Sequence, residues 1–355
     1  MTAVDHEVLV VGGGQAGLAV GYHLLQRDVD FLIVDAGPAI GHSWRSRWDS
    51  LKLFTPAQYA NLPGRAFPAP TDTYPGRDQV ADYLGSYATW LEPPLRLNTR
   101  LTRLETSGDH FRARTAAGST ITARQVVIAT GPFSQPFVPP VATGLAAVVQ
   151  VHTADYRNPT RFPDGVVLVV GGGNSGFQIA AELASAGRRV VLSEGRQNAC
   201  VPQRPLGRDI FWWQDRLGLL RVAANSPLGR KMQANDGTVI GSSRRQLTQR
   251  GVSFRPRLVG GQGRLVGFSD GSSLQVDAVL WATGFVIDDS WIGIDGVLDD
   301  WSRLRHERGV VTGAAGLYTV GRPWQTTIGS ALLGFVQHDA RTIAQQITTT
   351  LPGHS

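Results

Sequence analysis

The sequence predicts an α/β protein with two similar domains, the second inserted into the first. A β-branched run at residues 7–11 is followed by Gly12-Gly13-Gly14-Gln15-Ala16-Gly17 and a helical pattern that continues to Leu25. A second run at residues 166–170 is followed by Gly171-Gly172-Gly173-Asn174-Ser175-Gly176 and a helical pattern that continues to Ala186. The two segments begin 171 − 12 = 159 residues apart, which indicates an internal duplication of one strand–turn–helix unit.

Each copy continues in the same register. The next strand ends at Asp35 in the first copy and at Glu194 in the second, and 35 − 12 and 194 − 171 both equal 23. Later strands run into Thr130-Gly131 and into Thr283-Gly284. A last strand ends at Gly321, and a final helix is expected over residues 330–347. These positions predict one domain from residues 1–158 and 286–355 and another from residues 159–285.

The glycine segments are typical of Rossmann-like, three-layer dinucleotide-binding domains. In Gly12-x-Gly14-x-x-Gly17 the first glycine permits the tight turn, the second lets the backbone approach a pyrophosphate, and the third permits close helix–strand packing. The phosphates would then face the N-terminus of a helix, where unpaired N–H groups and the dipole favour anions. An acid after the second strand accepts hydrogen bonds from the ribose hydroxyls.

Composition narrows the function classes. The 355 residues carry a net charge of +6, but the arginines are scattered and no basic run contains interleaved aromatics, so we expect no nucleic-acid partner. Cys200 is the single cysteine, which rules out a dithiol redox pair. The sequence shows no signal peptide, no apolar run long enough for a membrane span and no metal-ligand spacing. We therefore expect a cytoplasmic protein without bound metal or membrane partner.

With these residues placed, the whole chain resembles the class B flavin-dependent monooxygenases, in particular the short bacterial flavin-containing monooxygenases and the flavoproteins associated with cation-efflux systems. The segments that carry the resemblance are residues 12–17, 41–48, 53–56, 74–77, 129–131, 152–157, 171–176, 282–285 and 330–335. The family fingerprint F-x-G-x-x-x-H-x-x-x-(F/Y)-(K/R) is matched in its second half by His152, Tyr156 and Arg157. Ala146 and Val148 stand where the family has Phe and Gly.

Several residues have two interpretations. His152 is expected to fix the linker between the domains, in preference to transferring a proton. Trp44 and Trp48 fit a substrate pocket or the core equally well, and Trp212 and Trp213 are assigned to the pocket. The ending Tyr156-Arg157 resembles the branch of the family that oxidises heteroatoms, whereas the Baeyer–Villiger branch usually has Trp at position 156.

The resemblance implies FAD in the first domain and NADPH or NADH in the second. It further implies that reduced flavin activates O₂ as a C4a-(hydro)peroxyflavin and transfers one oxygen to a small nucleophilic sulfur or nitrogen substrate. Three alternatives stay open: an NAD(P)H oxidase that releases hydrogen peroxide, Baeyer–Villiger-type oxygenation of a ketone, and a non-catalytic nucleotide sensor. A flavin disulfide reductase of the thioredoxin-reductase type is excluded, because it needs a redox-active dithiol that Cys200 alone cannot supply. A homodimer is an alternative to a monomer.

No catalytic side chain is assigned, because the chemistry belongs to the cofactor. Glu194 favours the free 2′-hydroxyl of NADH, and Arg196 two residues later could offset its charge toward a 2′-phosphate. The residues expected to bind the two cofactors are Gly12, Gly14, Gln15, Ala16, Gly17, Asp35, Ala36, Trp44, Arg47, Thr55, Thr130, Gly131, Gly171, Gly173, Asn174, Ser175, Gly176, Glu194, Arg196, Thr283, Gly284, Gly321 and Leu332.

Overall fold

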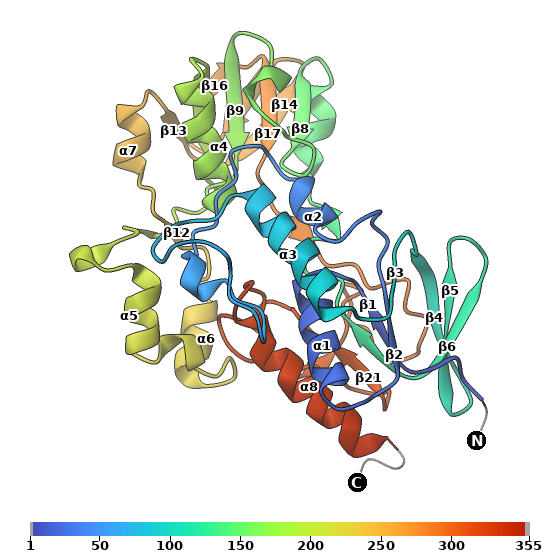
Figure 1. The fold of residues 1–355 in the computed structure, drawn as a ribbon. Helices are drawn as coiled ribbons and strands as arrows, with labels where there is room; N and C mark the ends of the chain where they lie inside the picture. Colours follow the sequence, from blue (N-terminus) through green and yellow to red (C-terminus); the bar gives the residue numbers. More distant parts are fainter. Residues whose placement is uncertain (1–2, 352–355) are drawn as a thin grey trace.

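A computed structural model gives the structure of residues 3–351, in which two mainly parallel sheets lie one above the other (Figure 1). The larger sheet has the order β19-β20-β21-β6-β1-β2-β3, and a β4–β5 hairpin pairs with β6. Its strands are β1 (His6–Val11), β2 (Phe31–Val34), β3 (Leu95–Arg96), β4 (Leu101–Ser107), β5 (His110–Thr115), β6 (Thr120–Ile128), β19 (His306–Glu307), β20 (Val310–Val311) and β21 (Leu317–Thr319).

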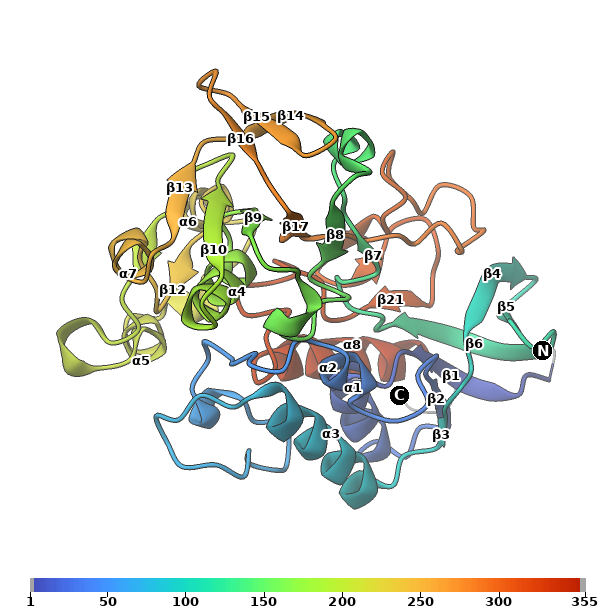
Figure 2. The same ribbon diagram turned by 90° about the horizontal axis from the view of Figure 1, so that it is seen from above.

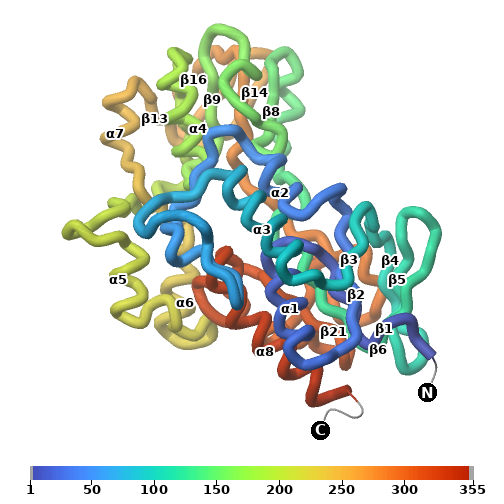
Figure 3. The backbone as a smooth tube through the Cα atoms, viewed as in Figure 1, coloured from blue at the N-terminus to red at the C-terminus, as the bar shows by residue number. Residues whose placement is uncertain are grey.

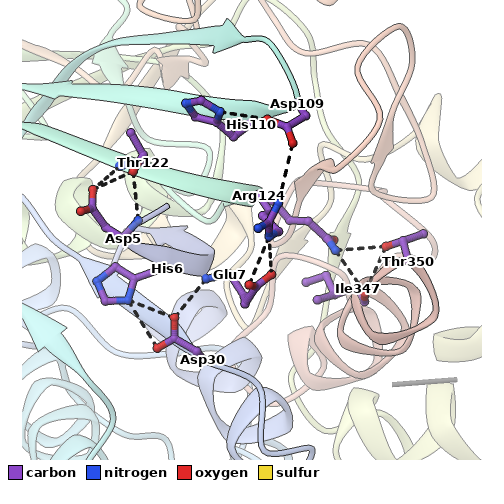
Figure 4. A network of polar contacts seen from close by, with 11 residues as sticks. Asp5, His6, Glu7, Asp30, Asp109, His110, Thr122, Arg124, Ile347 and Thr350 are labelled. Atoms are coloured by element: carbon purple, nitrogen blue, oxygen red, sulfur yellow. Dashed lines mark hydrogen bonds and ion pairs between the residues drawn. The ribbon is translucent and has the colours of Figure 1, made fainter. Parts of the chain in front are cut away.

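This sheet is covered on both faces, as its continuous apolar strands predict. Val8 and Val10 pack into a core with the helices α1 (Gln15–Leu25), α3 (Arg77–Leu91) and α8 (Val336–Thr350). Leu9 and Val11 pack into the opposite core, with Leu104 among its members. Glu7 of β1 pairs with Arg124 of the neighbouring β6 (Figure 4). The Gln125 side chain donates to the Ile347 carbonyl in the last turn of α8.

The smaller sheet is wholly parallel, with the order β13-β10-β9-β17-β8. Helices α4 (Asn174–Ser185) and α7 (Arg244–Gln249) lie on one side, and a three-stranded antiparallel sheet lies on the other. The strands are β8 (Val149–His152), β9 (Val166–Val170), β10 (Arg189–Ser193), β13 (Ser253–Arg255), β14 (Leu258–Gln262), β15 (Leu265–Phe268), β16 (Ser273–Gln275) and β17 (Ala278–Trp281). The structure thus confirms the predicted fold class of two three-layer, Rossmann-like domains.

The chain leaves the larger sheet after β6 and returns to it only at β19, so the smaller sheet is an insertion. The two crossing segments pair with each other as β7 (Gln135–Pro136) and β18 (Phe285–Val286). β8 precedes residue 159 but belongs to the smaller sheet, because it pairs with β17. Figure 2 shows the two domains from above. The domain limits predicted at residues 158 and 285 stay a prediction.

Other segments bridge the domains. After α2 (His42–Arg45) the chain runs up to the smaller domain (Figure 3), where the Gln178 side chain donates to the Lys52 carbonyl at 3.2 Å. A segment of the smaller domain reaches the larger domain in turn. It contains α5 (Ile210–Arg216) and α6 (Pro227–Gln233), and it is flanked by the paired strands β11 (Cys200–Val201) and β12 (Val239–Ile240). There the Tyr74 hydroxyl donates to Asp209 at 2.6 Å.

The final helix begins later than expected. The sequence predicts helix from residue 330, but α8 begins at Val336. Residues 330–335 form turns and a bend instead. At Gly334 the backbone packs directly on that of Tyr59, since an added β-carbon would lie 2.1 Å from the Tyr59 carbonyl oxygen.

Candidate functional site

Two of the three glycines in the first motif are required by the protein itself. Gly12 has a φ of +111°, and a β-carbon there would lie 2.5 Å from the Ala129 carbonyl oxygen. A β-carbon at Gly17 would lie 1.8 Å from the Gly12 carbonyl oxygen. The turn from β1 into α1 therefore packs against the end of β6, where Thr130-Gly131 follows.

Gly14 is different. Its φ of −78° and ψ of −167° suit any residue, and a β-carbon there would meet no protein atom within 4 Å. Neither backbone strain nor packing explains a glycine at this position. The open space in front of Gly14 lies at a cavity and fits a ligand that approaches the backbone, as the pyrophosphate of FAD does. The residues present therefore fit FAD.

The second motif repeats this geometry. Gly171 has a φ of +124° and approaches the Ala282 carbonyl, and a β-carbon at Gly176 would lie 2.0 Å from the Gly171 carbonyl oxygen. Gly173, the equivalent of Gly14, has a φ of −90° and no protein atom within 4 Å of an added β-carbon. The same reasoning gives this motif an open approach for a second dinucleotide.

Asp35 is already oriented by the backbone. Its carboxylate accepts the N–H of Gly13 at 2.6 Å and the N–H of Gly37 at 2.7 Å, one on each oxygen. Each carboxylate oxygen keeps acceptor capacity. Because Asp35 also lines the cavity, it is placed to accept a ribose hydroxyl.

One cavity of about 860 Å³ connects the first glycine motif to the second domain. Of the residues predicted to bind cofactors, it is lined by Gly12, Gly14, Gln15, Ala16, Asp35, Ala36, Trp44, Arg47, Thr55, Thr130, Gly131, Asn174, Ser175, Gly321 and Leu332. The predicted residues outside its lining are Gly17, Gly171, Gly173, Gly176, Glu194, Arg196, Thr283 and Gly284. Among these, Gly17, Gly171 and Gly176 make the close backbone contacts that shape the two glycine turns.

Arg47 lines this cavity with a guanidinium that lies over two aromatic rings. Its guanidinium lies 5.2 Å from the ring centre of Phe133 and 4.9 Å from that of Phe285, and it makes no hydrogen bond or ion pair with any residue from 3 to 351. Burial, and then the nearby charge of Arg157, lower the pKa of Arg47. Such a group is free to bind an anion. Sequence reasoning missed both phenylalanines, although each closely follows a Thr-Gly pair.

His152 fixes the crossing between the domains. Its Nδ1 accepts the Ala154 N–H at 3.1 Å, so the proton resides on Nε2, which donates to the Gly284 carbonyl at 3.0 Å. The imidazole is buried, and burial lowers its pKa, which favours the neutral form. Both nitrogens are thus occupied, which supports the positioning role expected for His152.

The other fingerprint residues are also held by the protein. The buried Tyr156 donates to Glu182 at 2.9 Å, and Arg157 donates to the carbonyls of Ser46 and Ala154. Arg157 therefore ties the linker to the segment that follows α2.

The tryptophans separate into two groups. Trp44 and Trp48 both line the cavity, and Trp48 is also part of the second domain's core. The assignment of Trp212 and Trp213 to the pocket was wrong for this cavity, because neither lines it. They pack edge-to-face on each other, and Trp213 donates to the Pro205 carbonyl at 2.9 Å.

Glu194 and Arg196 lie in surroundings that the sequence did not indicate. The buried Glu194 accepts two hydrogen bonds of 2.8 Å from Arg244, a residue that carried no signal in the sequence. Arg196 donates to the Ala234 carbonyl and to the Asn235 side chain.

Within residues 3–351 no cluster of three or more His, Cys, Asp or Glu side chains could hold a metal ion. None of the helices in that range has the length and apolar character to cross a membrane.

One dinucleotide motif lines the cavity, and a second reaches it through Asn174 and Ser175; this arrangement defines a flavoprotein of the two-nucleotide type. The chain belongs to the pyridine nucleotide-disulphide oxidoreductase family, which matches residues 9–204. The CzcO-like oxidoreductase of Geobacillus kaustophilus (strain HTA426) is 45% identical over 96% of this chain and 98% of its own. A solved flavin-containing monooxygenase from Stenotrophomonas maltophilia has a TM-score of 0.83 at 27% identity and covers 98% of this chain and 99% of its own. The probable indole-3-pyruvate monooxygenase YUCCA8 of Arabidopsis thaliana is 27% identical over 78% of this chain and 74% of its own.

These likenesses confirm the predicted enzyme class. The protein is a class B flavin-dependent monooxygenase with FAD and NADPH or NADH as cofactors. Its single cysteine distinguishes it from members that reduce disulphides through a dithiol.

Proposed function

We propose that this monooxygenase transfers one oxygen atom to the sulfur or nitrogen of a small nucleophilic substrate. In the overall reaction, two electrons come from NADH or NADPH and two from the substrate, and together they reduce O₂. One oxygen atom bonds to the substrate, and the other leaves as water with the hydride and one proton. The observation that carries this proposal is the cavity of about 860 Å³ that is lined by the first glycine motif and by Asn174 and Ser175 of the second.

FAD, when bound, supplies the redox chemistry and the reaction with O₂. The chain's own residues bind and position. Gly12 to Gly17 and Asp35 would hold the pyrophosphate and ribose of FAD, while Gly171 to Gly176 would hold the nicotinamide dinucleotide. Arg47 would meet an anionic part of a cofactor.

Part of the cavity wall is apolar. Trp44, Phe54, Phe133, Phe285 and Leu332 line it with large apolar side chains. An apolar wall keeps water from a reactive centre and strengthens the electrostatic interactions inside. This supports transfer of oxygen to a bound substrate over loss of the oxygen to solvent.

Two relatives support oxygen transfer by their names. The Stenotrophomonas maltophilia protein is a flavin-containing monooxygenase, and YUCCA8 is a probable indole-3-pyruvate monooxygenase. The sulfur or nitrogen preference, the cytoplasmic location and the choice between monomer and homodimer are carried by the sequence alone.

The test compares peroxide released with nicotinamide dinucleotide consumed, with and without a thioether, an amine or a ketone. A thioether or amine that suppresses peroxide and yields one oxygenated product per dinucleotide supports the proposal. Peroxide equal to dinucleotide consumed, whatever is added, would establish an oxidase instead. Coupling only to the ketone would establish Baeyer–Villiger oxygenation.

Bleaching of the yellow protein by NADPH or NADH under nitrogen excludes a non-catalytic sensor, and flavin content near one per chain is expected.

A further inference from the structure

Glu194 occupies the same register as Asp35 but is held in a different way. Asp35 receives backbone N–H groups, whereas the two oxygens of Glu194 receive Nε and Nη2 of Arg244, each at 2.8 Å. The Glu194 side chain is only 4% exposed and that of Arg244 is 29% exposed. A β-carbon at Gly172 would lie 2.6 Å from Glu194 Oε1, so the ion pair lies directly against the second glycine motif.

Arg244 is fixed in this position by its own element. It is the first residue of α7, whose N-cap Ser243 accepts the Gln246 N–H. Its Nη1 and Nη2 donate to the Asn198 carbonyl at 3.0 Å, and the guanidinium lies 5.8 Å from the ring centre of Phe177. The guanidinium therefore donates two parallel hydrogen bonds to the carboxylate, a bidentate geometry that is the strongest form of this pairing.

The surroundings of the pair are positive. Arg196 is exposed and bonds only to the neutral groups of Ala234 and Asn235. Arg257 is exposed, and its Nη2 lies 3.2 Å from the position of an added β-carbon at Gly195. The formal charges of Glu194, Arg244, Arg196 and Arg257 sum to +2.

An isolated carboxylate at this register accepts a free ribose 2′-hydroxyl and repels a 2′-phosphate. Repulsion between like charges at a binding site weakens binding and so produces selectivity. Here Arg244 cancels the charge of the carboxylate without removing its capacity to accept a hydroxyl. The excess positive charge beside it favours an anion.

We propose that Arg244 is a specificity-determining residue which, by neutralising Glu194, lets the site accept the 2′-phosphate of NADPH as well as the 2′-hydroxyl of NADH. This inference rests on the proposed assignment of the second motif to the nicotinamide dinucleotide. Arg244 acts through Glu194, and its role is electrostatic.

Two opposite substitutions test it on the FAD-loaded protein. The readouts are calorimetric binding of adenosine 5′-phosphate and adenosine 2′,5′-bisphosphate, and kcat/KM for flavin reduction by NADH and NADPH under nitrogen. The unaltered protein is expected to take both ligands within about tenfold of each other. Arg244→Gln should weaken the bisphosphate by about tenfold or more relative to the monophosphate, because Glu194 is then unpaired. Glu194→Gln should shift the same ratio toward the bisphosphate by about tenfold or more.

Arg245→Gln is the matched control. It makes the same charge change one residue along, at an exposed side chain that has no ion pair within residues 3–351, and should alter the ratio by less than about twofold. If Arg244→Gln fails to fold because it leaves a buried carboxylate, the double variant Glu194→Gln/Arg244→Gln replaces it. Its ratio should lie between those of the unaltered protein and Glu194→Gln, because both charges of the pair are then absent. A ratio equal to that of Glu194→Gln would show that Arg244 has no influence and would overturn the inference.

Two other results would overturn the inference: a ratio that does not respond to Glu194→Gln, or equal shifts in Arg244→Gln and Arg245→Gln. Failure of the proposed function would look different. In that case neither adenosine nucleotide would bind the unaltered protein, and neither dinucleotide would bleach its flavin.

Discussion

Gly14→Ala separates the binding of FAD from the stability of the fold. The backbone of Gly14 already has φ and ψ angles that alanine adopts, and the added β-carbon would meet no protein atom within 4 Å. Gly14 is also the N-cap of α1, where alanine is less favourable than glycine by up to about 1 kcal/mol. Alanine gains roughly 0.4–1 kcal/mol by restricting the unfolded chain. These opposing effects leave the free energy of unfolding of the apoprotein within about 1 kcal/mol of its original value.

FAD should respond differently, because its pyrophosphate approaches the backbone at this position. An extra carbon in a closely packed contact costs roughly 1–3 kcal/mol. This corresponds to a rise in the Kd for FAD of about fivefold to about 150-fold. Flavin absorbance per chain after purification, followed by titration of the apoprotein with FAD, measures the loss, and thermal unfolding of the apoprotein measures the fold.

Gly17→Ala provides the contrast. Its β-carbon would lie 1.8 Å from the Gly12 carbonyl oxygen, so the turn itself must distort and the apoprotein should be destabilised. A Gly14→Ala protein that keeps a full complement of flavin and an unchanged Kd would refute the assignment of this motif to FAD.

Three other perturbations follow from the same structure. Gly173→Ala should keep its flavin but raise the KM for NADPH and NADH at least about tenfold, measured by stopped-flow flavin reduction; a parallel loss of flavin would contradict it. Burial, and then Arg27, lower the pKa of His23 from its ordinary 6.5 to about 4, so the unfolded chain binds more protons between these values. The free energy of unfolding should fall by about 2 kcal/mol between about pH 7.5 and about pH 5, and His23→Gln should remove that part of the fall in urea titrations. Arg322→Met leaves the buried Asp289 without its 2.7 Å partner and should cost about 3–5 kcal/mol, whereas Arg303→Met at the more exposed pair with Asp299 should cost about 0.5 kcal/mol or less.

The sequence alone determined the two dinucleotide units. A strand, a glycine turn and a helix are close neighbours in the chain. Gly12, Gly17, Gly171 and Gly176 are selected by φ angles or contacts that arise within that turn or at the adjacent strand end. The repeat of Gly12 to Asp35 in Gly171 to Glu194 was therefore visible without coordinates, as was the exclusion of a dithiol by Cys200.

Only the tertiary structure decided which distant side chains contact each dinucleotide unit. Arg244 meets Glu194 from 50 residues away, and Phe133 and Phe285 enclose Arg47 from the two different segments that cross between the domains. Trp212 and Trp213 have the residue type of a pocket wall but pack on each other instead. Local geometry is fixed by steric contacts between near neighbours, which recur wherever the same residues occur. Contacts between distant segments depend on how all the layers pack together, and no short pattern records that packing.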